Sequence, residues 1–137
     1  MAELDFLMLA DHVKVEGGQV SLLGGGFDRV FTTAVPAPHV IGVVARVLFT
    51  ESECNQRHHV EMAFRQDQQL LAQAGGEVGA TPAEDAPPGW PVAALFGFNL
   101  QLILPVEGIY QVDLRLDGAV LRTQLFEVRL TPTRPAN

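Results

Sequence analysis

Apolar and polar residues alternate along the last third of the chain, and this pattern constrains the fold more than any other feature. From residue 110 to residue 116 every even position is apolar or aromatic and every odd position is polar. A period of two is typical of a β-strand with one buried face. Asp117-Gly118 follows, and this pair supplies the positive φ angles of a tight two-residue hairpin. The pattern therefore predicts antiparallel strands.

Further strand candidates cover most of the chain. Turn residues separate them, and Glu16-Gly17-Gly18 predicts a first hairpin. The last candidate changes phase, which predicts a bulge near Leu125-Phe126. The candidates are residues 4–10, 11–15, 19–23, 40–50, 58–65, 96–104, 109–116 and 119–130. We expect an all-β fold, specifically an antiparallel immunoglobulin-like (Greek-key) β-sandwich of about seven to nine strands.

Length and composition predict one domain. The chain has 137 residues, of which 47% are hydrophobic, and this is enough for a sizeable core. We expect a single sandwich domain over residues 1–130 and a flexible C-terminal tail over residues 131–137, which contain two prolines. The single cysteine, Cys54, excludes an intrachain disulfide, and the acidic N-terminus lacks the charge pattern of a secretory signal. These features predict a cytoplasmic location.

Three segments allow more than one interpretation. Gly24-Gly25-Gly26 predicts a bulge or a close backbone crossing, because phosphate binding would need a helix to begin there and no helical pattern does. Residues 65–74 fit a hairpin, which we prefer, or a short helix. Residues 75–91 are rich in glycine and proline and predict a long exposed connection.

The strand candidate at residues 40–50 is apolar on both faces. Alternate positions from Ile41 to Phe49 would face the core, whereas Val44 and Leu48 would face away from it. The outer face then needs a cover, which a loop, an extra strand or another subunit can provide. Val44 and Leu48 are therefore candidate interface residues, and a homo-oligomer is the most concrete form of that interface.

Trp90 is the third candidate interface residue. It lies within Pro87-Pro88-Gly89-Trp90-Pro91, a stretch stiffened by prolines. A tryptophan on such a loop can anchor a partner protein, because it covers much area and has little conformational entropy to lose. It can also fold back over the open end of the sandwich, and we favour this capping role.

The overall charge argues against two classes of partner. Nine basic and sixteen acidic residues give a net charge of −7, which repels the phosphates of nucleic acids and anionic membrane surfaces. Arg115, Arg122 and Arg129 lie close together in sequence. They would form either a local basic patch or, as we expect, solvated positions on an outer sheet face.

No group of residues meets the requirements of a metal or catalytic site. A strand sends His58 and His59 to opposite faces, so only His59 lies beside Glu61, and we expect a surface histidine there. Cys54 lies in a polar segment without an oxyanion-forming turn, so we expect an exposed thiol. Calcium-binding spacing is missing from the scattered acidic candidates Glu51, Glu53, Glu84 and Asp85. We therefore predict no catalytic residue, no metal and no cofactor.

Two resemblances add to this interpretation. The stretch Pro105–Val112 resembles the corner before the penultimate strand of immunoglobulin-like domains, where a tyrosine hydroxyl, here that of Tyr110, bonds to nearby backbone. The chain also resembles an uncharacterised family of small bacterial single-domain β-sandwich proteins, a domain of unknown function. The segments that carry this second resemblance are Phe6–Asp11, Leu23–Arg29, Pro36–His39 and Gly108–Tyr110. It implies the architecture and a bacterial cytoplasmic setting, and it brings no known activity.

The sequence thus predicts a non-enzymatic protein that acts through its surface. We expect a protein-interaction module or a self-associating subunit. The alternative is a sandwich that binds a small apolar ligand, either between the sheets in a cavity lined by Phe64, Phe96 and Phe98 or under the loop of residues 75–91.

Overall fold

The computed structural model describes residues 2–131, which form ten β-strands and one short 3-10 helix. Within this part no helix is long and apolar enough to cross a membrane. The elements are β1 (Glu3–Ala10), β2 (His12–Glu16), β3 (Gln19–Leu23), β4 (Arg29–Thr32), β5 (Ala37–Phe49), η1 (Glu51–Glu53), β6 (Arg57–Gln66), β7 (Gln69–Gly79), β8 (Val92–Leu104), β9 (Gly108–Leu116) and β10 (Ala119–Leu130).

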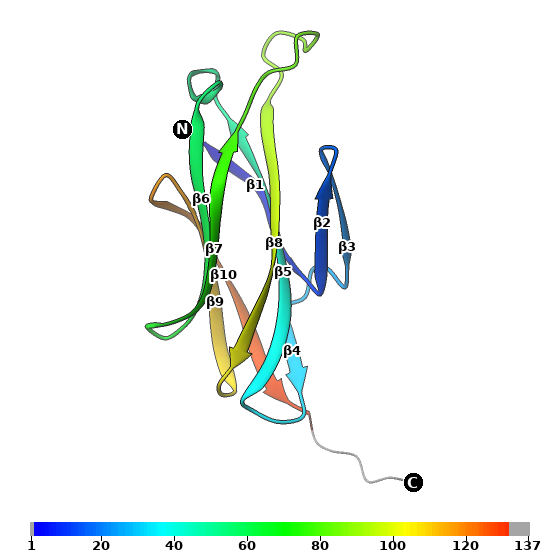
Figure 1. The fold of residues 1–137 in the computed structure, drawn as a ribbon, viewed down its shortest axis with the longest axis vertical. Helices are drawn as coiled ribbons and strands as arrows, with labels where there is room; N and C mark the ends of the chain where they lie inside the picture. Colours follow the sequence, from blue (N-terminus) through cyan, green and yellow to red (C-terminus); the bar gives the residue numbers. More distant parts are fainter. Residues whose placement is uncertain (1, 132–137) are drawn as a thin grey trace.

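The described strands form three sheets (Figure 1). A three-stranded sheet has the order β1-β5-β8, and a five-stranded sheet has the order β4-β10-β9-β6-β7. The third sheet is the separate β2–β3 hairpin. Neighbouring strands are antiparallel except β10 and β4, which are parallel, so the five-stranded sheet is mixed. The all-β prediction is confirmed, whereas the strand number and the third sheet differ from the predicted two-layer antiparallel sandwich.

The core lies between the two larger sheets. The side chains that the alternation in β5 and β9 predicted to be buried lie in it. Residues 41, 43, 45 and 47 of β5 are fully buried and belong to one core cluster with residues of β6, β8, β9 and β10. The even residues of β9 are buried as predicted. The largest of the facing side chains are Met62, Phe64, Tyr110, Leu114 and Phe126.

The β2–β3 hairpin covers the other face of the three-stranded sheet (Figure 1). Val13 of the hairpin packs with Ala10 and Val44 in a second, smaller cluster. Asn99 of β8 fixes the hairpin, since its Oδ1 accepts a hydrogen bond from the Val13 amide at 2.9 Å and its Nδ2 donates to the Val13 carbonyl at 2.8 Å. A Cβ at Gly42 would lie only 3.0 Å from the Val13 nitrogen, so glycine makes this close approach possible.

Val44 is therefore corrected from an interface candidate to a buried residue. It has no exposed surface, and its cover comes from the same chain instead of another subunit. Of the three covers that the sequence allowed, the extra strand pair is the one present.

The ambiguous segments are resolved by the strand boundaries. Residues 65–74 form the β6–β7 hairpin with Asp67 at φ 51°, so the hairpin is confirmed and the short helix is wrong. The predicted connection 75–91 is shorter than expected, because β7 continues to Gly79. The register shift in β10 lies between Val120 and Arg122, so the bulge predicted at Leu125-Phe126 is misplaced.

Two local predictions are confirmed by hydrogen bonds. The Gly26 amide donates to the Leu9 carbonyl at 2.8 Å, so the glycine run is a close backbone crossing. The Tyr110 hydroxyl donates to the Val106 carbonyl at 2.6 Å and accepts from the Val106 amide at 3.2 Å, as in the tyrosine corner. Thr131 donates from its amide to the Thr32 carbonyl at 2.8 Å, and the rest of the predicted tail lies outside the described residues.

Candidate functional site

The loop 80–91 between β7 and β8 carries Trp90 at one end of the molecule (Figure 1). Two tight turns shape it, because the Ala86 amide donates to the Ala83 carbonyl at 3.1 Å and the Trp90 amide donates to the Pro87 carbonyl at 3.0 Å. In the second turn Pro88 precedes Gly89, whose φ is 77°, the arrangement of a type II turn. Proline and the turn bonds therefore hold Trp90 in a defined place.

The Trp90 side chain is displayed to solvent. It is 65% exposed, one of the most exposed large apolar residues in the described part of the chain. The capping role that we favoured from the sequence is therefore wrong, because a cap would bury the ring. The exposed ring keeps Trp90 as an interface candidate.

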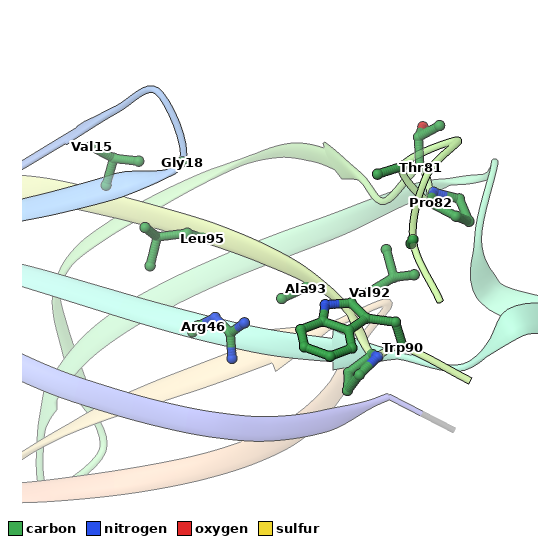
Figure 2. A pocket seen from close by; sticks show the side chains of 12 residues that line it. Val15, Gly18, Arg46, Thr81, Pro82, Trp90, Val92, Ala93 and Leu95 are labelled. Carbon is green, nitrogen blue, oxygen red and sulfur yellow. The ribbon is translucent and has the colours of Figure 1, made fainter. Parts of the chain in front are cut away.

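Open grooves lie on both sides of this loop. Groove A, of about 380 Å³, is bounded by Trp90, by Arg46 of β5, by Leu95 of β8 and by Val15 of the β2–β3 hairpin. Figure 2 shows the Trp90 ring at one end of groove A and Val15 and Leu95 at the other. Arg46 forms an ion pair with Asp5, so the charge inside groove A is compensated.

Groove B, of about 480 Å³, lies between the same loop and the segment that follows β5. One wall consists of loop residues 82–83 and 86–91, including Trp90, together with Val92 at the start of β8. The other wall consists of Phe49, Thr50, Glu51 and Cys54. Trp90 thus belongs to both grooves and divides them.

The second wall of groove B is held by His58, which the sequence placed on the face opposite His59 without assigning it a partner. His58 is 6% exposed and stacks on Phe49 with ring centroids 4.7 Å apart. Its Nδ1 lies 2.7 Å from an Asp117 carboxylate oxygen, and its Nε2 lies 2.8 Å from the Glu53 carbonyl oxygen. Both partners are acceptors, so only the doubly protonated imidazolium can donate to both. We call this arrangement the His58 clasp.

The pKa values of the clasp residues follow from these bonds. The hydrogen bond to the Glu53 carbonyl, and next the bond to Asp117, raise the pKa of His58 above its usual value. The bond from His58, and next the bond from the His59 amide at 2.9 Å, lower the pKa of Asp117. The clasp joins η1 to the β9–β10 turn through charge-assisted hydrogen bonds.

Leu48 lies at the same end of the molecule as Trp90. It is half-buried and pairs in register with Glu3 of β1 and Ala93 of β8, and Ala93 lines groove A. The structure therefore brings two of the three predicted interface residues, Leu48 and Trp90, to one end and removes Val44 from the surface.

The remaining chemical candidates are kept apart. Cys54 is buried, with its Sγ 3.3 Å from the Thr50 carbonyl, so the exposed thiol that we predicted is wrong. His59 is exposed on the face opposite His58, as predicted. Within the described residues no group of three or more histidine, cysteine, aspartate or glutamate side chains is placed to hold a metal ion.

The three arginines of the suggested basic patch have different surroundings. Arg129 forms an ion pair with Glu127 at 2.6 Å, and Arg122 is exposed. Arg115 is half-buried, and its Nε has no hydrogen-bond partner within the described part of the chain. These positions therefore do not act together as one cationic surface.

Sequence reasoning missed two polar contacts: the hydrogen bonds between Asn99 and Val13 that fix the β2–β3 hairpin, and the His58 clasp. Asn99 stands at a position that the alternation of its strand leaves polar, so nothing in the local pattern distinguished it from a solvated residue. The partners of His58 come from 5 and 59 residues away along the chain, so no local pattern could identify them.

The comparisons with known proteins give a family and no activity. A family model described as "Family of unknown function (DUF6941)" matches residues 5–129, which is most of the chain. No curated protein matches the chain.

Proposed function

We propose that this chain, which belongs to the DUF6941 family of unknown function, is a non-enzymatic interaction module that binds a partner protein at the end carrying Trp90. The observation that supports the proposal is the exposed tryptophan on a loop fixed by two turns. Burying an exposed indole ring against a partner removes apolar area from water at little entropic cost. A cytoplasmic location and the immunoglobulin-like arrangement of the two larger sheets stay part of this proposal.

Affinity capture from the native host tests the proposal with two matched variants. Trp90→Ala removes the ring, whereas Ile103→Ala removes a side chain that is 60% exposed at the opposite end of β8. We expect a protein that binds the wild type and Ile103→Ala and is lost with Trp90→Ala, and that binds again when both purified proteins are mixed. Identical captured sets for all three baits would contradict the proposal.

Self-association is the second form of this proposal. Leu48 and Trp90 still support it, but Val44 no longer does. Each copy also carries a net charge of −7, so two copies repel each other most at low salt. Light scattering at micromolar concentration over a salt series measures this directly, and a dimer that Trp90→Ala dissociates would establish it.

A small apolar ligand is the second candidate function. Groove B favours it, because its volume of about 480 Å³ lies within the range of ligand pockets. The predicted cavity between the sheets has less support, since Phe64 and Phe96 are buried in the core cluster. Native mass spectrometry of the protein purified from its host would show such a ligand as an added mass, and a bare chain would contradict it.

A further inference from the structure

We infer that groove B takes an arginine-containing extended segment of the partner protein, an inference that rests on the proposed docking role of Trp90. Two features of the groove carry it: its charge and its exposed ring. Each is a property of described residues on the two walls.

The charged side chains at groove B that belong to the described residues are acidic. Glu51 lines the groove, and Glu84 and Asp85 are the central residues of the loop turn between Ala83 and Ala86, which both line it. All three carboxylates are exposed. Within the described residues none of the three forms an ion pair, and no lysine or arginine is among the residues that line groove B. Charge complementarity therefore requires a cationic occupant.

Groove A differs in this respect, which assigns the occupant to one side of the loop. Ala83 and Ala86 line groove A as well, so the acidic turn borders both grooves. Among its described lining residues, however, groove A has no carboxylate, and its Arg46 already pairs with Asp5, whereas Glu51 lines groove B. A cationic segment that contacts Trp90 is thus directed into groove B.

The exposed ring selects arginine over lysine. A guanidinium stacks flat on an indole face and can donate to a carboxylate at the same time through its forked N–H groups. Trp90 and Glu51 line opposite walls of groove B, so the groove contains both kinds of partner. A lysine ammonium is a compact charge without this planar match.

The single tryptophan of the chain is the probe for the test. We would titrate the full chain with an acetylated (Gly-Arg)5 amide peptide and record Trp90 fluorescence. Parallel titrations use (Gly-Lys)5, (Gly-Glu)5 and the apolar (Gly-Leu)5 in place of the arginine peptide. We expect saturable quenching by the arginine peptide, at least about 3-fold weaker binding of the lysine peptide, and loss of affinity between low and high salt.

Two charge variants separate a local site from the general negative charge. Glu84→Gln with Asp85→Asn removes two charges beside Trp90, whereas Asp67→Asn with Glu107→Gln removes two charges from the turns at the opposite end of the molecule (Figure 1). We expect the first pair to weaken arginine-peptide binding by about 3- to 10-fold and the second pair by less than about 2-fold.

The outcomes distinguish this inference from the proposed function. Equal weakening by both charge pairs, or no saturable response to the arginine peptide, overturns the inference. If the apolar peptide alone binds, or if the captured partner binds through Trp90 without salt dependence, the docking role of Trp90 stands and its cationic occupant does not. If Trp90→Ala leaves partner capture unchanged, the proposed docking role of Trp90 is wrong, and the inference about groove B is then wrong as well.

Discussion

At the scale of single residues, the His58 clasp is the feature with the clearest chemical consequence. A carboxylate and a carbonyl on either side of the buried imidazole stabilise its cationic form, and the ring connects η1 to the β9–β10 turn. Because Phe49 stacks on the same ring and lines groove B, the clasp also positions one wall of the candidate site. His58 thus supports a wall of groove B without lining the groove itself.

The clasp makes stability depend on pH in a defined direction. The pKa of His58 is raised above 6.5, so its contribution is complete below about pH 6.5 and is lost as the pH rises through the folded-state value. The pKa of Asp117 is lowered from 3.8, so its contribution is present above that value and is lost as the pH falls through the folded-state value. We expect the free energy of unfolding to be larger near pH 5.5 than near pH 8.5, by about 1 kcal/mol.

His58→Gln tests this expectation, and His59→Gln is the control. The variant at His58 loses the imidazolium and should be less stable than the wild type by about 1–3 kcal/mol at pH 5.5, with most of the dependence above pH 6 removed. His59 is exposed and contributes its backbone amide to Asp117, which glutamine keeps. Urea unfolding at several pH values measures both. Equal pH profiles for wild type and His58→Gln would show that the clasp is not the cause.

Tyr110 is a second residue whose polar group acts inside an apolar environment. It is 1% exposed, its ring stacks on Phe126 at 5.5 Å, and burial raises the pKa of its hydroxyl. Tyr110→Phe keeps the ring and removes both bonds to Val106. We expect a loss of about 1–3 kcal/mol in the free energy of unfolding, because the Val106 backbone groups lose their partner. An unchanged urea midpoint would mean that water replaces the hydroxyl.

At the scale of elements, the β2–β3 hairpin is the addition that separates this fold from the predicted two-layer sandwich. It covers a sheet face that would otherwise expose Val44, and it contributes Val15 to groove A. The fit depends on the small residues Gly42 and Gly97, where a Cβ would come within 3.2 Å of Val13 atoms. Gly42 and Gly97 are therefore needed for the packing of the hairpin on the sheet, and not for the geometry of a turn.

Gly42→Ala should therefore loosen the hairpin without unfolding the core. The new Cβ would lie 2.9 Å from Asn99 Oδ1 and 3.0 Å from the Val13 nitrogen, so the pair that fixes the hairpin must move. We expect hydrogen exchange to speed up in residues 12–23, with a total cost of about 1–3 kcal/mol. Gly76→Ala is the control, because a Cβ there meets nothing within 4 Å. Equal protection of the hairpin in both variants would contradict this account of its packing.

At the scale of the whole molecule, the alternating pattern predicted which strands exist and which side of each faces the core. It succeeded for β5, β6 and β9, because a buried face requires an apolar residue at every second position, and this pattern is visible within a short stretch of sequence. It failed where partners lie far apart in the chain. The separate hairpin sheet depends on Asn99 reaching Val13 across 86 positions, and the candidate site depends on His58 reaching Asp117 across 59. Trp90 could be identified from its proline-rich context, but its exposure depends on how the loop folds.

The two larger sheets share one core cluster, so neither sheet can bury its apolar face alone. We expect residues 2–131 to unfold in a single cooperative transition, with equal calorimetric and van't Hoff enthalpies. A chain truncated after Thr131 keeps the bond from the Thr131 amide to the Thr32 carbonyl and should melt within about 2 °C of the full chain. Differential scanning calorimetry of both chains measures this. A second transition would divide the predicted single domain, and a large drop in melting temperature would assign residues 132–137 a structural role that the sequence does not predict.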